Sequence, residues 1–161
     1  MLDIMMTEKQ QIEKATTDAF VALFNTREKQ DFVVQQYGDA PDAICKNSAG
    51  QIMQIEVTLT EDRHGDLPWM FGRFKERPDK TRIGSCLQGN VLEQLAVRLD
   101  DKTMKRYGKE TALVIRDSSG VDWDWEDVSK EVRYLLKVRG NPFDMGIWVL
   151  NRTKTRLHRL T

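Results

Sequence analysis

Apolar positions near the N-terminus recur at the spacing of an α-helix. The residues that would face inward are Ile12, Ala15, Thr16, Ala19, Phe20 and Leu23. Thr7 precedes this run and Gln10 follows Thr7 by three residues, which is the pattern of a capping box at a helix start. The spacing therefore predicts a helix over 8–25.

Three short segments rich in β-forming residues follow, over 31–37, 42–46 and 51–60. The second and third are separated by Asn-Ser-Ala-Gly, at 47–50, whose residues favour a tight turn. The pattern predicts three consecutive antiparallel strands, because short turns join neighbouring strands in this way.

The second half of the chain predicts two more helices and two more strands. Apolar residues at helical spacing indicate helices over 87–107 and 124–138, and continuous apolar runs indicate strands over 111–116 and 145–151. No internal repeat or low-complexity linker interrupts the chain, which favours one domain over 1–161. The order αβββαβαβ predicts an α/β fold in which a parallel pair of strands, flanked by helices, adjoins an antiparallel hairpin.

Alternation along strand 51–60 places polar side chains on one face. Gln54, Glu56 and Thr58 share that face, and Met53, Ile55, Val57 and Leu59 form the apolar face. A hairpin register that brings Asp42 opposite Glu56 would face two carboxylates, which repel each other. A divalent cation would remove this repulsion, because carboxylate and carbonyl oxygens and water are the ligands that Mg²⁺ prefers. An ordinary hairpin with its charges in solvent is the alternative.

The motif resembles that of a known enzyme superfamily. Pro41-Asp42, a spacer of thirteen residues and then Glu56-Val57-Thr58 are similar to the Pro-Asp…(Asp/Glu)-x-Lys motif of the restriction-endonuclease-like nucleases, in a Glu-x-Thr version. The common αβββαβ core of that superfamily, a mixed central sheet flanked by helices, corresponds to the elements predicted over 8–116.

The resemblance implies a Mg²⁺ (or Mn²⁺) site and a catalytic role for its residues. It implies that Asp42, Glu56 and the carbonyl of Val57 bind the metal, and that an acid of the first helix contributes to the site. Glu13 is the first candidate for this acid and Glu8 the substitute. An ordinary flank of an amphipathic helix is the alternative for Glu13.

Thr58 departs from the motif, because it stands where the superfamily has its lysine. A threonine hydroxyl donates only a neutral hydrogen bond, so Thr58 would orient water or phosphate. Lys46 is about 13 Å from Asp42 along an extended strand and is a poor replacement. Lys102 and Gln88 lie near the inward face of helix 87–107, where they could assist the site or simply extend to solvent from the edge of the core.

The net charge of zero, with 25 basic and 25 acidic residues, does not point to nucleic acid, but the distribution of charge does. Segment 71–82 carries five basic and two acidic residues beside aromatic ones, and the last ten residues, 152–161, carry four basic groups and no acid. Such segments contact phosphates. The expected contacts are Arg73, Lys75, Arg77, Lys80, Arg82 and Gln88. A solvated loop and a frayed tail are the alternatives.

Composition limits the other classes of function. The hydrophobic content of 40% and charged content of 31% are typical of a globular protein, and the sequence has no apolar stretch that could span a membrane. The N-terminus lacks the features of a signal peptide, so a cytoplasmic location is expected. Cys45 and Cys86 lack zinc-site spacing and are expected to be reduced structural thiols.

These observations lead to the expectation of a Mg²⁺-dependent nuclease, acting on DNA in preference to RNA. Many nucleases of this fold act as dimers because two strands need two sites, so a homodimer is also considered. Two alternatives stay open. The chain could be a catalytically inactive member that binds nucleic acid or regulates a partner, or the hairpin could be structural and the protein could bind another protein.

Overall fold

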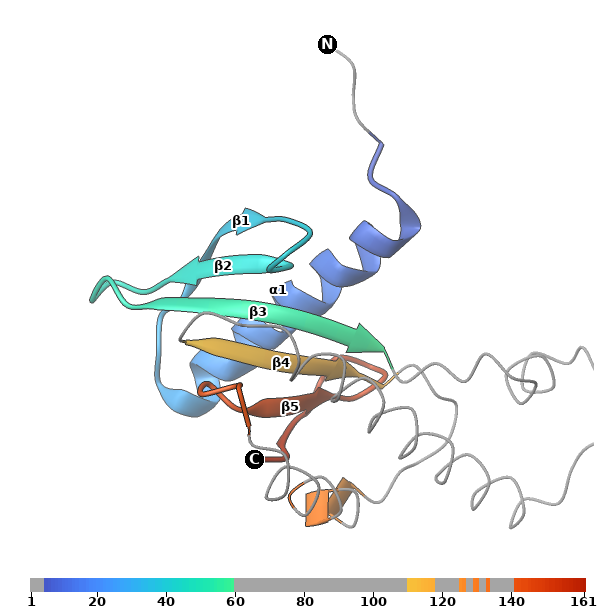
Figure 1. The fold of residues 1–161 in the computed structure, drawn as a ribbon, viewed down its shortest axis with the longest axis vertical. Coiled ribbons are helices and arrows are strands. Elements are labelled where there is room, and N and C mark those ends of the chain that lie inside the picture. Colours follow the sequence, from blue (N-terminus) through green and yellow to red (C-terminus); the bar gives the residue numbers. More distant parts are fainter. Residues whose placement is uncertain (1–4, 60–109, 118–124, 127–128, 131–132, 134–140) are drawn as a thin grey trace, which may run out of the picture.

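A computed structural model describes residues 5–59, 110–117, 125–126, 129–130, 133 and 141–161. Its centre is a six-stranded mixed sheet in the order β1-β2-β3-β4-β5-β6, with one face covered by α1 (Figure 1). The elements are α1 (Glu8–Glu28), β1 (Val33–Tyr37), β2 (Ala43–Lys46), β3 (Ile52–Leu59), β4 (Thr111–Arg116), β5 (Ile147–Leu150) and β6 (Leu157–Arg159). The prediction of an α/β fold is confirmed.

Helix α1 begins at the predicted capping box. The Thr7 hydroxyl accepts from the Gln10 backbone N–H, and the Gln10 side chain accepts from the Thr7 N–H. The helix ends at Glu28, three residues beyond the predicted end, and Lys29 caps it in the left-handed conformation. Its buried side chains are Thr16, Thr17, Phe20, Val21 and Phe24. Of the six residues predicted to face inward, Thr16 and Phe20 are buried and the other four are partly exposed. The buried face is therefore rotated toward Thr17, Val21 and Phe24 relative to the predicted one.

Strands β1, β2 and β3 form the predicted antiparallel arrangement. The turn between β2 and β3 is closed by a hydrogen bond from the Gly50 N–H to the Asn47 carbonyl, and Gly50 has a φ of 81°. Glycine adopts this positive φ without the steric cost that a side chain would add. Strands β3, β4 and β5 run parallel, so the parallel part of the sheet has three strands where the sequence predicted a pair.

The alternative of a frayed tail is wrong for the last residues. Leu157, His158 and Arg159 form β6, which pairs antiparallel with β5, and Leu160 is fully buried. The segment has only two apolar residues among many charged ones, so it shows no clear period 2. Its strand conformation depends on pairing with β5, which the local sequence does not reveal.

Each face of the sheet carries its own hydrophobic cluster. The α1 face includes Phe20, Phe24, Met53, Ile55, Val114 and Trp148, and the opposite face includes Leu113, Ile115, Phe143, Ile147, Val149 and Leu160. Trp125 packs against this second cluster. Strands β4 and β5 are therefore buried on both faces, which explains their continuous apolar sequences.

Some predicted elements cannot be compared in full. The residues described within 124–138, at 125–126, 129–130 and 133, are helical as predicted. The predicted helix 87–107 and the basic segment 71–82 lie outside the described residues, as does Cys86. None of the helices in the described part of the chain has the length and apolar character of a membrane span.

We expect the buried thiol of Cys45 to make the protein less stable at alkaline pH. Burial raises the pKa of its thiol from the ordinary 9.0 to about 11, and the side chain is fully buried. Between these values the unfolded chain loses the thiol proton while the folded chain keeps it, so the free energy of unfolding falls as pH rises from about 9 to 11, by up to about 2 kcal/mol.

Urea denaturation between pH 8 and 10.5 under reducing conditions measures this effect. The comparison is between Cys86→Ser, which keeps the Cys45 thiol, and the double variant Cys45→Ala/Cys86→Ser, which lacks it. The two proteins therefore differ in this thiol alone. The stability advantage of the single variant should shrink as pH rises. A constant difference would contradict the assigned role of the Cys45 thiol.

Candidate metal centre

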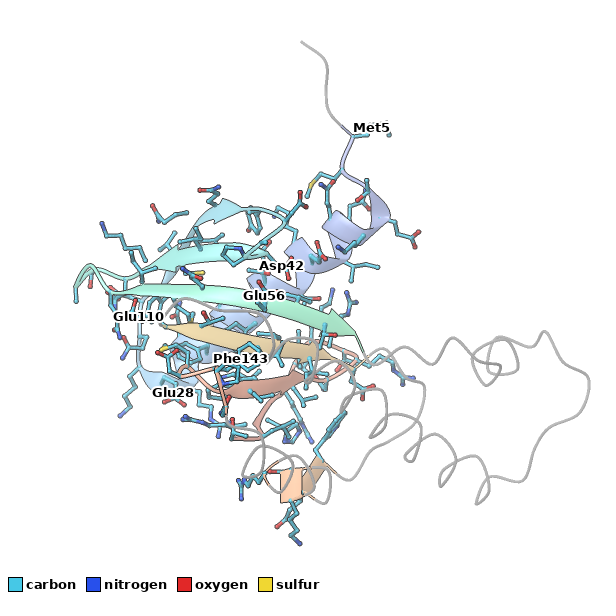
Figure 2. The ribbon with its side chains drawn as sticks, viewed as in Figure 1. Met5, Glu28, Asp42, Glu56, Glu110 and Phe143 are labelled. Carbon is cyan, nitrogen blue, oxygen red and sulfur yellow. The ribbon has the colours of Figure 1, made fainter. Side chains whose placement is uncertain are left out.

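The hairpin register places the two predicted metal ligands opposite each other. Ala43 pairs with Ile55 and Ile44 with Gln54, so Asp42, one residue before β2, faces Glu56 on β3. Figure 2 labels both at neighbouring positions of the sheet. Their exposed fractions are 7% and 9%. Two nearly buried carboxylates at facing positions are costly unless cations or hydrogen bonds compensate the charge.

Asp42 is held in place by two backbone hydrogen bonds. Its Oδ2 accepts from the Val57 N–H at 2.7 Å, and its backbone carbonyl accepts from the Gly38 N–H at 2.9 Å. The first bond joins the Asp42 side chain to the backbone of β3 just beyond the start of β2 and holds the carboxylate beside Val57. A ligand fixed in this way loses little side-chain entropy on binding.

Glu13 lies on the same hollow as Asp42. This hollow, of about 370 Å³, lies between the start of α1 and the turn after β1, and is lined by Met6, Gln10, Glu13, Lys14, Tyr37, Gly38, Asp39 and Asp42. The Glu13 side chain is only 14% exposed and pairs with Lys9 at 3.3 Å. The fold thus brings Glu13 and Asp42 together, while Glu8 and Glu56 are not among the lining residues.

Two lysines near this hollow were not predicted as site residues. A hydrogen bond and the charge of Glu13 raise the pKa of Lys9, with smaller contributions from Asp42 and Asp39. Lys14 lines the hollow itself. The sequence could have indicated both lysines, because each stands four residues before an acid of α1, as in helical ion pairs. Lys9 precedes Glu13 and Lys14 precedes Asp18 in this way.

Lys14, Asp18 and Tyr37 form a polar network beside the hollow. Lys14 is 2.8 Å from Asp18 and 5.0 Å from the centre of the Tyr37 ring, and the Tyr37 hydroxyl donates to Asp18. Burial and the Asp18 carboxylate raise the pKa of Tyr37. Burial acts to raise the pKa of Asp18, but the bonds from Lys14 and Tyr37 lower it overall. The network connects α1 to β1 and helps to fix the wall of the hollow.

Thr58 shares the Glu56 face of β3, by strand alternation, and is 8% exposed. Val57 lies between them and its backbone contacts Asp42. Lys46 is exposed at the opposite end of β2, where it pairs with Ile52. This position agrees with the expectation that Lys46 does not replace the missing motif lysine.

The donors near Asp42 fit a hard divalent cation with incomplete protein ligation. Among the described residues no group of three or more His, Cys, Asp or Glu side chains is arranged to hold a metal. Asp42 and Glu56 are two carboxylates at facing positions, and the Asp42 carboxylate bonds to the backbone of Val57. Mg²⁺ usually binds through one or two carboxylates and keeps several waters, so this set suits Mg²⁺ better than a metal that needs a complete cage of protein ligands.

The other predicted residues cannot be placed. Lys102, Gln88, Arg73, Lys75, Arg77, Lys80 and Arg82 all lie outside the described residues. Comparison with protein-family models, with curated proteins and with solved structures gives no match to this chain. The functional argument therefore depends on the residues and geometry of the chain itself.

Proposed function

We propose that the protein is a Mg²⁺-dependent nuclease with a restriction-endonuclease-like core, hydrolysing phosphodiester bonds of DNA in preference to RNA. The described order of elements supports this proposal. Helix α1 is followed by the antiparallel strands β1, β2 and β3, and β4 then pairs parallel with β3. This is the expected αβββαβ order apart from the second helix, whose predicted range lies outside the described residues.

The observation that carries the proposal is that Asp42 and Glu56 face each other across the hairpin of β2 and β3, at the end away from its turn. Both side chains are nearly buried, and the Asp42 carboxylate contacts the backbone of the Glu56-Val57-Thr58 motif. A solvent-facing hairpin would leave these charges in water. Their burial in facing positions favours the metal-binding interpretation.

Each residue has a distinct role in this proposal. Asp42, Glu56 and the Val57 carbonyl would hold Mg²⁺, which supplies a bound water of lowered pKa and neutralises charge on the phosphate. Glu13 would add negative charge beside Asp42, with Lys9 limiting the repulsion between them. Thr58 would orient a water molecule or a phosphate oxygen through its hydroxyl.

A catalytically inactive protein of the same fold is the second candidate function. Thr58 favours it, because the hydroxyl at this position has no positive charge to stabilise the transition state. In this candidate the fold would bind nucleic acid or a regulatory partner without cutting. Metal binding and activity separate the two functions.

Calorimetric titration with MnCl₂ and MgCl₂ tests the metal site. Wild-type protein should bind a divalent ion, and Asp42→Ala should abolish binding, because one of two carboxylate ligands is lost. Asp31→Ala is the matched control, since Asp31 is an exposed acid that accepts from the Ser48 N–H. Absence of binding to the wild type, or unchanged binding to Asp42→Ala, would overturn the proposal.

A further inference from the structure

A second hollow lies along the outer edge of β6, at the other end of α1. It has a volume of about 300 Å³ and is lined by Arg27, Trp125, Glu126, Ser129, Lys130, Arg133, His158, Arg159 and Leu160. Three segments far apart in the sequence meet here. They are the end of α1, the helical residues within 125–133 and the strand β6, which Figure 1 shows near the C-terminus.

Cations outnumber acids among the described residues that line this hollow. Arg27, Lys130, Arg133 and Arg159 are four cations, of which Arg27 also pairs with Glu28 at 3.5 Å, and Glu126 is the one acid among the described lining residues. Cations gathered in one hollow repel each other and attract anions, whereas the hollow at Asp42 has acids among its lining residues. The two hollows therefore suit ligands of opposite charge.

The arginines of the second hollow are positioned by backbone carbonyls of the C-terminal segment. Arg27 Nη1 donates to the Leu157 carbonyl at 2.9 Å, Arg133 Nε to the Leu160 carbonyl at 3.0 Å and Arg159 Nε to the Thr161 carbonyl at 2.7 Å. A guanidinium has five N–H donors, and each of these bonds uses one. Arg27 Nε also faces the Glu28 carboxylate at 3.5 Å. Because a guanidinium has more donors than these contacts use, each group keeps capacity for further hydrogen bonds.

Trp148 restricts two of these guanidinium groups further. Arg27 lies 5.3 Å from its ring centre and Arg159 lies 5.1 Å from it. The fold has therefore already restricted these side chains before any ligand arrives. Such preorganisation reduces the entropy lost on binding.

A purely structural role accounts for only part of this arrangement. Arginines that bond to carbonyls at the edge of β6 protect this edge from pairing with another chain. Protection of an edge does not require that cations from three segments converge on one hollow. Lys130 lies on the same hollow with an exposed side chain and adds a fourth cation to the three arginines.

We infer that this hollow binds a phosphate group of a nucleic-acid backbone. Arginine recognises phosphate through charge-assisted, often bidentate hydrogen bonds, and backbone phosphates supply most of the affinity of proteins for nucleic acid. The choice of nucleic acid over free phosphate rests on the proposed nuclease function. The charge and geometry of the hollow do not depend on it.

The hollow and the candidate metal centre can be tested separately. Glu13 and Arg27 are 14 residues apart in α1, which is about 21 Å along a helix axis. Substitutions in one are therefore not expected to disturb the other. EDTA removes divalent cations, so DNA affinity measured in EDTA depends on the hollow and not on a bound metal.

The experiment compares two double variants that remove the same charge from the chain. Arg133→Gln/Arg159→Gln removes two cations from the hollow, and Arg152→Gln/Arg156→Gln removes two exposed cations of the same C-terminal region outside the hollow. Affinity for a fluorescein-labelled DNA duplex is measured by anisotropy at several salt concentrations in EDTA. Thermal melting checks that each variant is folded.

The hollow variant should weaken DNA binding by about 10-fold or more and lower the slope of log affinity against log salt by about 1, as expected for one lost phosphate contact. The control variant should change little. Equal losses in both double variants, or no loss in the hollow variant, would overturn the inference. Loss of inorganic tripolyphosphate binding with unchanged DNA binding would overturn nucleic acid as the ligand.

Lys130→Glu keeps the test decisive if the double variant does not fold. This substitution reverses a charge at an exposed side chain of the hollow and should also weaken DNA binding, with Lys154→Glu as the matched control outside the hollow. If Mn²⁺ binds at Asp42 while Lys130→Glu leaves DNA affinity unchanged, the inference fails and the nuclease proposal stands. If Lys130→Glu weakens DNA binding while the wild-type protein binds no metal, the nuclease proposal fails and the inferred phosphate site is supported.

Discussion

Asp42→Asn is expected to reduce Mg²⁺-dependent DNA hydrolysis by about 100-fold or more, the scale found when one preorganised electrostatic group is removed. Asparagine keeps an oxygen that can accept from the Val57 N–H, as Asp42 Oδ2 does at 2.7 Å, but it lacks the negative charge that holds a cation. Glu56→Gln should have a similar effect for the same reason. Nicking of supercoiled plasmid DNA with and without MgCl₂ measures the loss.

The controls for this prediction separate loss of metal from loss of fold. Asp31→Asn removes a charge from an exposed acid between α1 and β1 and should leave activity within about twofold of wild type, because ordinary surface substitutions have small effects. Thermal melting should show that Asp42→Asn remains folded. Wild-type rates in both Asp42→Asn and Glu56→Gln would show that the pair does not carry catalysis. If wild-type protein binds metal and DNA but does not cut, the inactive candidate is favoured.

Trp148→Ala is expected to lower the free energy of unfolding by about 3–5 kcal/mol, the usual range for an aromatic residue removed from a core. Trp148 is 1% exposed and its ring centre lies 5.4 Å from that of Phe24 and 6.1 Å from that of Phe20. Its Nε1 donates to the Met145 carbonyl at 2.8 Å. The alanine variant loses these contacts, leaves a cavity under α1 and removes a donor from a carbonyl.

Urea denaturation measures this loss of stability. Trp148→Phe should cost less than alanine, because a ring still packs against the phenylalanines although the hydrogen bond to Met145 is lost. Ile52→Ala is the surface control, since Ile52 is 43% exposed, and should cost less than about 1 kcal/mol. A loss below about 1 kcal/mol for Trp148→Ala would show that this ring is not central to the core.

Sequence patterns predicted the local elements because their signals are themselves local. Strand β4 was predicted at its observed bounds, and helix α1 begins where the capping box indicates. Hairpin register follows from the turn and from strand alternation, so the facing positions of Asp42 and Glu56 were also predictable. Burial of both acids was not, because it depends on what covers that face of the sheet.

Tertiary structure alone decided the features that join distant segments. Strand β6 forms only because β5 offers it a partner, and the cations around it come from α1, from the helical residues within 125–133 and from β6 itself. The meeting of Glu13 with Asp42 at one hollow likewise needs the packing of α1 against the sheet. Hydrophobic periodicity records which side of an element is buried, but it does not record which charged side chains from different elements come together. That convergence depends on the order and pairing of the strands.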